Sequence, residues 1–296
     1  MEVVLIVNPF ASAVSNERVS AVESELGRVA TVRTYFTQRP GHGTELAAES
    51  GDADAVVVLS GDGGFNEVLN GVPEGIPLGF LPGGGTSVLP RTLGLPRDAA
   101  EAARQVADAL EAGRVRRITV GRVNGRRFGF SAGIGLDAEL VRRVDALGRR
   151  EDGKRPGDLA YLGAAAKLVG SRRGRFEPEL EVRGHGRAAF ALVANTDPYS
   201  YAGAVAVHVA PEARFELGLD LVAPELVGPA DLPRLLRYVF TGRGQAAAKG
   251  VLYLHDFDRI EIACDRLLPL QADGEDLGDV DEAVFEAERD AIAVLI

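Results

Sequence analysis

Residues 56–70 read VVVLSGDGGFNEVLN, an apolar run that ends in Ser-Gly-Asp-Gly-Gly and passes directly into a helical pattern. The first four residues are uncharged and mostly β-branched, which is typical of a strand buried in a parallel sheet. Val68 and Leu69 resume an apolar face beyond the loop, as a helix packed on that sheet would. The segment therefore predicts a strand, a glycine loop and a helix.

This glycine loop has the chemistry of an anion site. Gly61, Gly63 and Gly64 let backbone N–H groups approach a phosphate closely, and a helix N-terminus adds partial positive charge. Asp62 would repel a bare phosphate, so its carboxylate favours a nucleotide bound with Mg²⁺. For this segment alone, a tight turn with a solvated aspartate is the equal alternative.

Strands and helices alternate from the N-terminus to about residue 112. The expected strands are 3–7, 31–36, 55–59 and 76–81, and the expected helices are 17–28, 44–50 with Thr44 as cap, 65–70 and 98–112. This βαβα order predicts an α/β domain with a doubly wound parallel sheet. Ligands of such sheets bind beyond the carboxyl ends of the strands, where the loops converge.

After about residue 116, short strands with turn signals replace this alternation. The expected strands are 118–123, 126–131, 179–182, 188–194, 219–222, 251–254, 259–263, 268–271 and 291–295, interrupted by helices at 159–169 and at 232–240 with Asp231 as N-cap. Asn124-Gly125 predicts a type I′ hairpin turn. We therefore expect an α/β nucleotide-binding domain, residues 1–117, and a β-rich antiparallel sandwich domain, residues 118–296, whose last residues return toward the first.

The composition is that of a globular protein and is compatible with the cytoplasm, where we expect it. The 296 residues are 46% hydrophobic and 26% charged, and the one cysteine, Cys264, excludes an internal disulfide and a multi-cysteine zinc site. The N-terminus has no basic leader, and no apolar run approaches the roughly 18 residues of a membrane span. A net charge of −10 argues against nucleic acid as the partner.

One local cluster of basic residues contrasts with this acidic balance. Its members are Arg142, Arg143, Arg149, Arg150, Lys154, Arg155, Lys167, Arg172, Arg173 and Arg175. The cluster, together with the alanine-rich helix expected at 159–169, could face lipid headgroups. A solvated basic surface and a core helix are the alternatives.

A second glycine loop follows another apolar strand. Residues 81–96 read LPGGGTSVLPRTLGLP and offer three glycine amides and the Thr86 hydroxyl to a phosphate tail. With two such loops, the chain resembles the diacylglycerol kinase catalytic family, which includes bacterial lipid kinases and sphingosine kinases and is distantly related to NAD kinases and phosphofructokinases. The resemblance rests on residues 60–67, similar to the family's Gly-Gly-Asp-Gly-Thr-x-Asn-Glu, on Asn8-Pro9, Thr37-x-x-Pro40-Gly41-His42 and residues 130–138, and on residues 271–275, similar to Gln-x-Asp-Gly-Glu.

The resemblance implies a lipid kinase that uses ATP and Mg²⁺. It would transfer the γ-phosphate to the hydroxyl of a lipid alcohol, diacylglycerol or a sphingoid-like base, at the inner membrane face, which it would contact transiently as a monomer or a homodimer. Glu275 is implied as the proton acceptor, and Asp62 as the carboxylate that organises metal or acceptor. The implied nucleotide site comprises Asn8, Thr37, Ser60, Gly61, Asp62, Gly63, Gly64, Phe65, Asn66, Glu67, Gly84, Gly85 and Thr86. The implied ligands of a structural Mg²⁺ are backbone carbonyls of Arg214, Leu217 and Leu219.

Three positions depart from the family pattern. Gly64 replaces a threonine, Val88 stands where many members carry aspartate, and Leu217 replaces an aspartate that supports the structural Mg²⁺, for which Glu216 or Asp220 could substitute. These departures leave open a catalytically silent nucleotide- or lipid-binding protein. A kinase for a non-lipid alcohol, in the manner of NAD kinases, is the other alternative.

Overall fold

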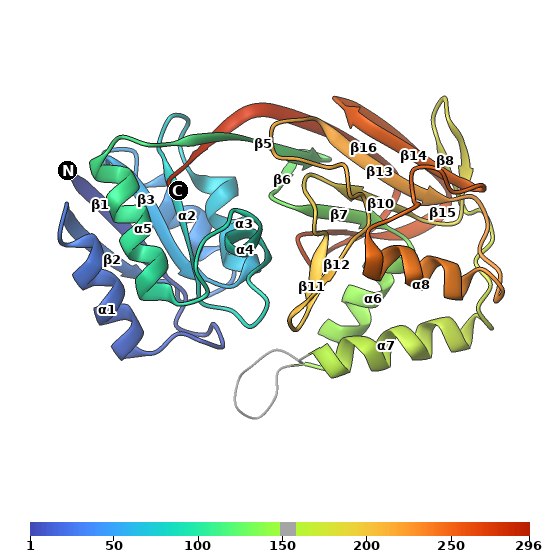
Figure 1. The fold of residues 1–296 in the computed structure, drawn as a ribbon, viewed down its shortest axis with the longest axis horizontal. Coiled ribbons are helices and arrows are strands. Elements are labelled where there is room, and N and C mark those ends of the chain that lie inside the picture. The colour runs from blue at the N-terminus through green and yellow to red at the C-terminus, as the bar shows by residue number, and fades with distance from the viewer. Residues whose placement is uncertain (149–157) are drawn as a thin grey trace. The chain divides into compact units, whose positions relative to one another are not determined.

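The structure is a computed structural model that describes the backbone of residues 1–148 and 158–296 and the side chains of residues 1–148 and 163–296. It divides into two compact units, drawn in Figure 1. The N-terminal unit comprises Met1–Thr119 and Asp290–Ile296, and the C-terminal unit comprises Val120–Arg289. Among the described residues, no helix has the length and apolarity to cross a membrane.

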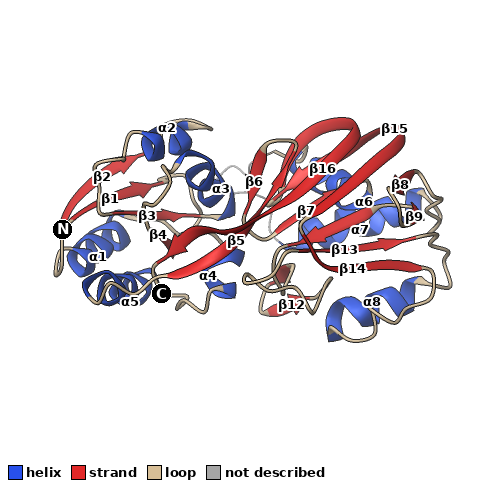
Figure 2. Ribbon diagram, turned by 90° about the horizontal axis from the view of Figure 1, so that it is seen from above, coloured by secondary structure: helices blue, strands red, loops and turns tan. Residues whose placement is uncertain are grey.

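The N-terminal unit is a doubly wound α/β layer structure. Its elements are β1 (Glu2–Val7), α1 (Asn16–Leu26), β2 (Thr31–Phe36), α2 (His42–Ala48), β3 (Ala55–Ser60), α3 (Asp62–Gly71), β4 (Leu78–Pro82), α4 (Val88–Thr92) and α5 (Ala99–Glu111). The strands pair in parallel in the order β4–β3–β1–β2. Figure 2 shows α1 and α5 on one face of this sheet and α2 and α3 on the other. The predicted parallel sheet with helices on both faces is confirmed.

Burial explains why β3 was recognisable in the sequence. All six of its residues are buried, since helices cover both faces, so the strand reads as one apolar run rather than an alternation. Helix α2, in contrast, begins two residues earlier than expected. Gly41 occupies its N-cap, and the Thr44 hydroxyl donates to the carbonyl of Glu67 at 2.9 Å, so the assignment of Thr44 as cap was wrong.

The C-terminal unit is built mainly from antiparallel strands. Its elements, two of which also have residues in the N-terminal unit, are β5 (Arg116–Val123), β6 (Arg126–Phe128), β7 (Ser131–Ile134), α6 (Leu136–Asp145), α7 (Asp158–Ser171), β8 (Leu180–Val182), β9 (Gly186–Ala188), β10 (Ala191–Ala194), β11 (Ser200–Ala202), β12 (Val205–Val207), β13 (Leu219–Pro224), α8 (Leu232–Thr241), β14 (Val251–Phe257), β15 (Arg259–Ala272) and β16 (Glu275–Val294). The hairpin turn predicted at Asn124-Gly125 is confirmed, because both residues have positive φ and β5 pairs with β6 around them.

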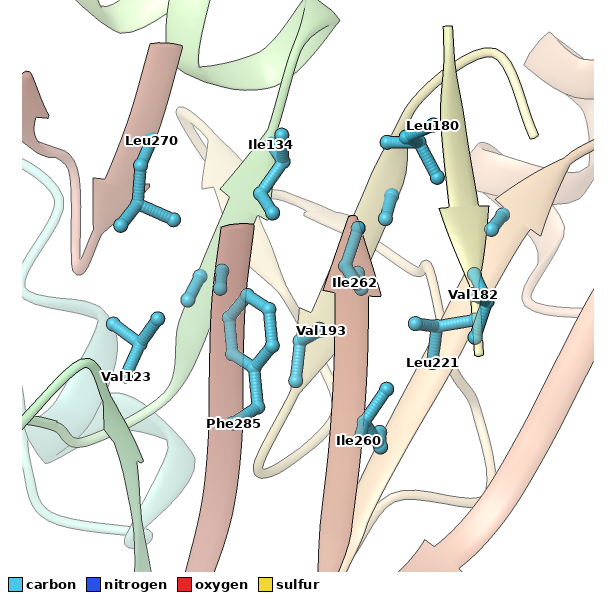
Figure 3. Packing of buried hydrophobic residues seen from close by; sticks show 14 of the residues in the cluster. Val123, Ile134, Leu180, Val182, Val193, Leu221, Ile260, Ile262, Leu270 and Phe285 are labelled. Atoms are coloured by element: carbon cyan, nitrogen blue, oxygen red, sulfur yellow. The ribbon is translucent and has the colours of Figure 1, made fainter. Parts of the chain in front are cut away.

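Strand β15 belongs to both layers of the sandwich, because its two ends pair with strands of different layers. Its first half pairs with β8 and its last residues pair with β7, with an irregularity between Ala263 and Leu268. Side chains from the two layers meet in one buried cluster, in which Ile262 of β15, Val193 of β10 and Phe285 of β16 lie close together (Figure 3). The expected β-rich antiparallel sandwich is confirmed.

Several elements differ from the expectation. Helix α6 was not expected, and the strands expected at 259–263 and 268–271 are one strand, β15. Asp231 stands at the N-cap of α8, but its carboxylate accepts from the N–H of Gly228 at 2.9 Å and makes no capping bond. At the C-terminus, Val294 of β16 pairs in parallel with Leu78, so the last residues extend the sheet of the N-terminal unit.

Candidate functional site

The two glycine loops, residues 61–64 and 83–87, follow the adjacent strands β3 and β4. The N–H of Gly83 donates to the carbonyl of Ser60 at 2.7 Å. A Cβ atom on Gly84 would lie 2.8 Å from the Cα atom of Gly61, and one on Gly83 would lie 3.0 Å from that of Ser60. Since real Cβ atoms do not approach backbone this closely, the contact between the loops requires glycine. The backbones of the two loops therefore lie against each other at the carboxyl edge of the sheet.

Asp62 ties the first loop to the helix that follows the second. It is the first residue of α3, and its Oδ1 atom accepts from the N–H of Val88 at 2.7 Å and, more weakly, from that of Leu89 at 3.4 Å. A carboxylate at a helix N-terminus is favoured by the exposed N–H groups there. The buried Ser87 closes the second loop, because its Oγ accepts from the N–H of Gly84 at 3.2 Å. Asp62 thus has a structural role as well as the chemical one predicted.

Ser60 and Gly64 form a sterically coupled pair. The Ser60 side chain is buried, and its Oγ atom has no hydrogen-bond partner among the described residues. A Cβ atom on Gly64 would lie far inside contact distance of this Oγ and 2.7 Å from the Ser60 Cβ. The serine at position 60 therefore excludes a threonine at position 64. The departure from the family pattern at Gly64 has its physical reason in Ser60.

Asn8 and Thr37 lie at the same edge of the sheet. The N–H of Asn8 donates to the Leu59 carbonyl at 3.0 Å, and that of Thr37 donates to the Val7 carbonyl at 2.9 Å. In the second loop, Gly85 is exposed and Thr86 is partly exposed. The N-terminal unit thus brings the predicted loop residues to one edge, as the strand order required.

Three predicted ligand residues on α3 instead support the fold with their side chains. Phe65 is buried and packs edge to face on Phe80, with ring centroids 5.5 Å apart. Asn66 is buried and accepts from the side-chain amide of Asn70 at 3.1 Å. Glu67 accepts from the N–H groups of Gly41 and Gly43, each at 2.9 Å, and so caps α2. These side chains therefore have structural roles, and their part in nucleotide binding stays a prediction.

Glu275 begins β16 immediately after a two-residue hairpin turn. Asp273 and Gly274 both have positive φ, and Ala272 pairs with Glu275 across the turn. The buried carboxylate of Asp273 accepts backbone N–H groups from Gly129 at 2.6 Å, Phe130 at 3.0 Å and Ser131 at 3.2 Å. Asp273 therefore anchors the turn to the strand segment at Ser131.

A second set of side chains holds the same turn from Gln271. Its Oε1 accepts from the N–H of Gly274 at 2.9 Å, and its amide group donates to Asp137 and to the Tyr199 hydroxyl. The Tyr199 hydroxyl donates to Asp137 at 2.7 Å. Burial raises the pKa of Asp137 and, together with the nearby Asp137 carboxylate, that of Tyr199. This network fixes the position of the turn from which Glu275 extends.

The Glu275 carboxylate forms an ion pair with Arg126 of β6. Both side chains are partly exposed, at 25% for Glu275 and 38% for Arg126, so the pair borders solvent. Sequence reasoning missed Arg126. Its place directly after Asn124-Gly125 was visible, but the strand pairing that brings it to Glu275 was not.

Arg214, Leu217 and Leu219 were predicted to bind a structural Mg²⁺ through their carbonyl oxygens. The carboxylate of the nearby Asp220 is not available to assist them. The carbonyl of Arg214 accepts from the N–H of Leu217 at 3.0 Å, and Leu219 begins β13. Asp220 is fully buried, where its carboxylate binds His255 Nδ1 at 2.9 Å and accepts from the N–H of Asp256 at 3.0 Å. Burial raises the pKa of Asp220, and the bond to Asp220 raises that of His255.

Asp220 therefore does not substitute for the missing aspartate at Leu217, because its oxygens are committed within the sandwich. Among the residues that the structure describes, no group of three or more histidine, cysteine, aspartate or glutamate side chains could hold a metal ion. The described donor set does not fit a carboxylate-supported metal site.

Family models match nearly the whole chain. The model described as "Diacylglycerol kinase catalytic domain" matches residues 2–123, and the model described as "YegS C-terminal NAD kinase beta sandwich-like domain" matches residues 131–296. A curated diacylglycerol kinase of Bacillus subtilis is 34% identical over 156 residues, 51% of this chain and 49% of the relative. The chain thus spans about half the length of the curated relatives it matches.

Solved structures show the same fold. A diacylglycerol kinase from Bacillus anthracis strain Sterne superposes with a TM-score of 0.72 at 19% identity, over 99% of this chain and 96% of that one. An NAD kinase from Archaeoglobus fulgidus, in complex with ATP, superposes with a TM-score of 0.53 at 15% identity, over 100% of this chain and 94% of that one. These likenesses confirm the predicted NAD kinase-like fold.

Proposed function

Because the chain belongs to the diacylglycerol kinase catalytic family, we propose that this phosphotransferase moves the γ-phosphate of ATP to the hydroxyl of a lipid alcohol. The observation that carries the proposal is the close contact of the two glycine loops at the carboxyl edge of β3 and β4. The N–H groups of Gly83 and Gly84 are used within the loops, but the backbone around them leaves a surface that phosphates could approach closely, because no side chain fits between Gly61 and Gly84.

Glu275 is the proposed proton acceptor. In the transfer, the acceptor oxygen forms a bond to the γ-phosphorus as the bond to the departing ADP oxygen breaks, and the hydroxyl proton passes to Glu275. The anchors at Asp273 and Gln271 hold the turn that carries this carboxylate. The ion pair with Arg126 orients it. When bound with ATP, Mg²⁺ would neutralise phosphate charge, with Asp62 as the carboxylate at the loops.

The lipid acceptor is supported by the names of the relatives. The Bacillus subtilis relative is a diacylglycerol kinase, so diacylglycerol is the first acceptor to test and a sphingoid-like base the second. A lipid acceptor would require the protein to meet a membrane surface, and we place it in the cytoplasm at the inner membrane face.

Transfer of label tests the proposal. The purified chain is incubated with Mg²⁺, γ-labelled ATP and a bacterial lipid extract, in parallel with Glu275→Gln and with the matched variant Glu282→Gln on the same strand. We expect label in the organic phase for the wild type and Glu282→Gln, and loss of at least about a hundredfold for Glu275→Gln. Label found only in the aqueous phase, on a soluble alcohol, would instead identify a non-lipid kinase.

The Asp220 geometry favours a second candidate, a catalytically silent nucleotide-binding protein. The carboxylate support for a structural metal is lost at Leu217, and Asp220 is bound to His255 instead. ATP binding without transfer of label to any acceptor pool would select this candidate.

A further inference from the structure

The outward face of α8 exposes apolar and basic side chains in a continuous stripe. Pro233, Leu236, Arg237 and Phe240 are exposed and recur three or four residues apart, which places them on one helix face. Leu236 is 57% exposed and Phe240 is 49% exposed. Tyr238 is buried, so the helix is held to the unit by its other face. Large exposed apolar side chains on a helix otherwise packed are a feature of interaction surfaces.

This helix and the segment after it are positively charged. Residues 228–250 contain four basic residues and one acidic residue, in a chain of net charge −10. The acidic residue, Asp231, is already paired with Arg234. Arg237 lies over the Tyr238 ring at 5.5 Å, and neither Arg237 nor Arg243 has an ion-pair partner in the described part of the chain. The positive charge of this face is therefore available to an external anion.

The β11–β12 hairpin lies beside α8 (Figure 1). Residues 202–205 at its tip read Ala-Gly-Ala-Val, without charge, and Val205 is 51% exposed. The N–H of His208, just after β12, donates to the carbonyl of Val239 on α8 at 2.8 Å. Hairpin and helix are thus held together within the C-terminal unit.

Three of the six described members of the basic cluster singled out in the sequence are, in contrast, held in ion pairs. Arg142 pairs with Asp276 and Asp279, and Arg143 and Arg172 both pair with Glu139. Its members Arg149, Arg150, Lys154 and Arg155 lie outside the described residues. Arg142, Arg143 and Arg172 line a pocket beside α6, and all three are engaged in ion pairs.

We propose that the α8 surface, defined by Val205, Leu236, Arg237, Phe240 and Arg243, docks onto an anionic lipid bilayer. Leu236, Phe240 and Val205 would enter the boundary between headgroups and acyl chains, while Arg237 and Arg243 would meet anionic headgroups. We infer an anionic lipid as the partner because this surface is basic in a chain that is acidic overall. The assignment rests on the proposed lipid acceptor, which such docking would bring to the enzyme.

Vesicle co-sedimentation without nucleotide tests the α8 surface. Wild-type protein is mixed with vesicles of equal parts phosphatidylglycerol and phosphatidylcholine, and with vesicles of phosphatidylcholine alone. We expect binding to the anionic vesicles that weakens with salt. Each arginine is expected to contribute roughly fivefold, so Arg237→Gln with Arg243→Gln should weaken binding by about 25-fold. Leu236→Gln with Phe240→Gln should weaken binding at least tenfold, by the loss of two apolar insertions.

Two matched variants serve as controls. Leu267→Gln replaces another leucine of the same unit, 60% exposed, and Arg175→Gln replaces an exposed arginine of the original basic cluster. Both should bind as the wild type does, and equal melting temperatures would show that all variants are folded. Binding that survives either double substitution, or is equal on neutral vesicles, would overturn the assignment.

Two further outcomes would also overturn the α8 surface as a membrane site. Loss of binding only in Arg175→Gln would move the membrane contact to the cluster near α7. A wild-type dimer that Leu236→Gln with Phe240→Gln converts to a monomer would show that a second copy covers the face. Because no transfer is measured, failure here is distinguishable from failure of the kinase proposal.

Discussion

A Cβ atom on Gly64 would clash with the side chain of Ser60, which is buried at the end of β3. Either residue can carry a side chain at this point of the first glycine loop, but both cannot. Gly64→Ala is therefore expected to destabilise the protein by about 1–3 kcal/mol, because overpacking a closed site forces the backbone to shift.

The pair permits a double-mutant cycle. Ser60→Gly should relieve most of the cost of Gly64→Ala, which gives a coupling free energy of about 1–2 kcal/mol in urea unfolding of the four proteins. Strictly additive losses would show that the two residues do not compete for the same space.

Asp62 should matter for both stability and nucleotide binding. Asp62→Ala removes the acceptor that caps α4, and we expect a loss of about 1 kcal/mol in the free energy of unfolding. Because this bond also ties the two loops, ATP affinity should fall by about tenfold or more.

Asp98→Ala is the matched control, since Asp98 caps α5 through the N–H groups of Ala100 and Glu101, each at 3.0 Å. Its stability should fall by a similar amount while its ATP affinity stays at the wild-type value. Calorimetric titration of both variants compares the two effects, and an equal loss of affinity in both would mean that Asp62 acts through general stability alone.

Arg126→Gln removes the partner of Glu275. We expect kcat/KM for label transfer to fall about tenfold, because the carboxylate loses a charged hydrogen bond that orients it.

Arg127→Gln is the control, because the neighbouring Arg127 pairs with Glu288. This variant should keep the wild-type kcat/KM. An unchanged kcat/KM in Arg126→Gln would show that Arg126 does not orient the proposed proton acceptor.

The elements that could be predicted are those whose local sequence reflects their surroundings in the fold. Strand β3 is a continuous apolar run because both its faces are covered, and the turns at Asn124-Gly125 and Asp273-Gly274 carry residues that tolerate positive φ. The two glycine loops follow from the same logic, since their glycines leave backbone accessible.

The features that escaped prediction depend on long-range contacts. Helix α6 buries only Ala138, Val141 and Val144 among charged residues, so its pattern is weak in the sequence. The capping of α2 by Glu67 joins elements far apart in the chain, as does the pair of Arg126 and Glu275. Spacing along the sequence does not reveal such pairings, which only the strand and helix packing create.

The buried Asp220 should give the protein a pH-dependent stability. The pKa of His255 is raised above its ordinary value of 6.5 by the bond to Asp220, so its contribution is fully present below pH 6.5 and is lost as the pH rises through the higher folded pKa. Burial raises the pKa of Asp220 above 3.8, which adds a loss of the same sign in a more acidic range.

His255→Gln should therefore lower stability at pH 6 by about 2 kcal/mol and flatten the decline at higher pH. Melting temperatures of both proteins from pH 5 to 9 measure this. A wild type whose stability rises through neutral pH would contradict the sign. His208→Gln serves as the control, because His208 pairs with Asp197 and not with Asp220.

The contact between the two glycine loops can be tested directly by ATP titration of Gly84→Ala against Gly85→Ala. A Cβ atom on Gly84 would lie 2.8 Å from Gly61 Cα and force the loops apart, whereas one on Gly85 would meet only Ser12 Oγ at 3.8 Å. If the loops form the phosphate site, the wild type and Gly85→Ala bind ATP with similar affinity, and Gly84→Ala loses about tenfold or more. Equal ATP affinity in all three proteins, or no ATP binding by the folded wild type, would contradict the account.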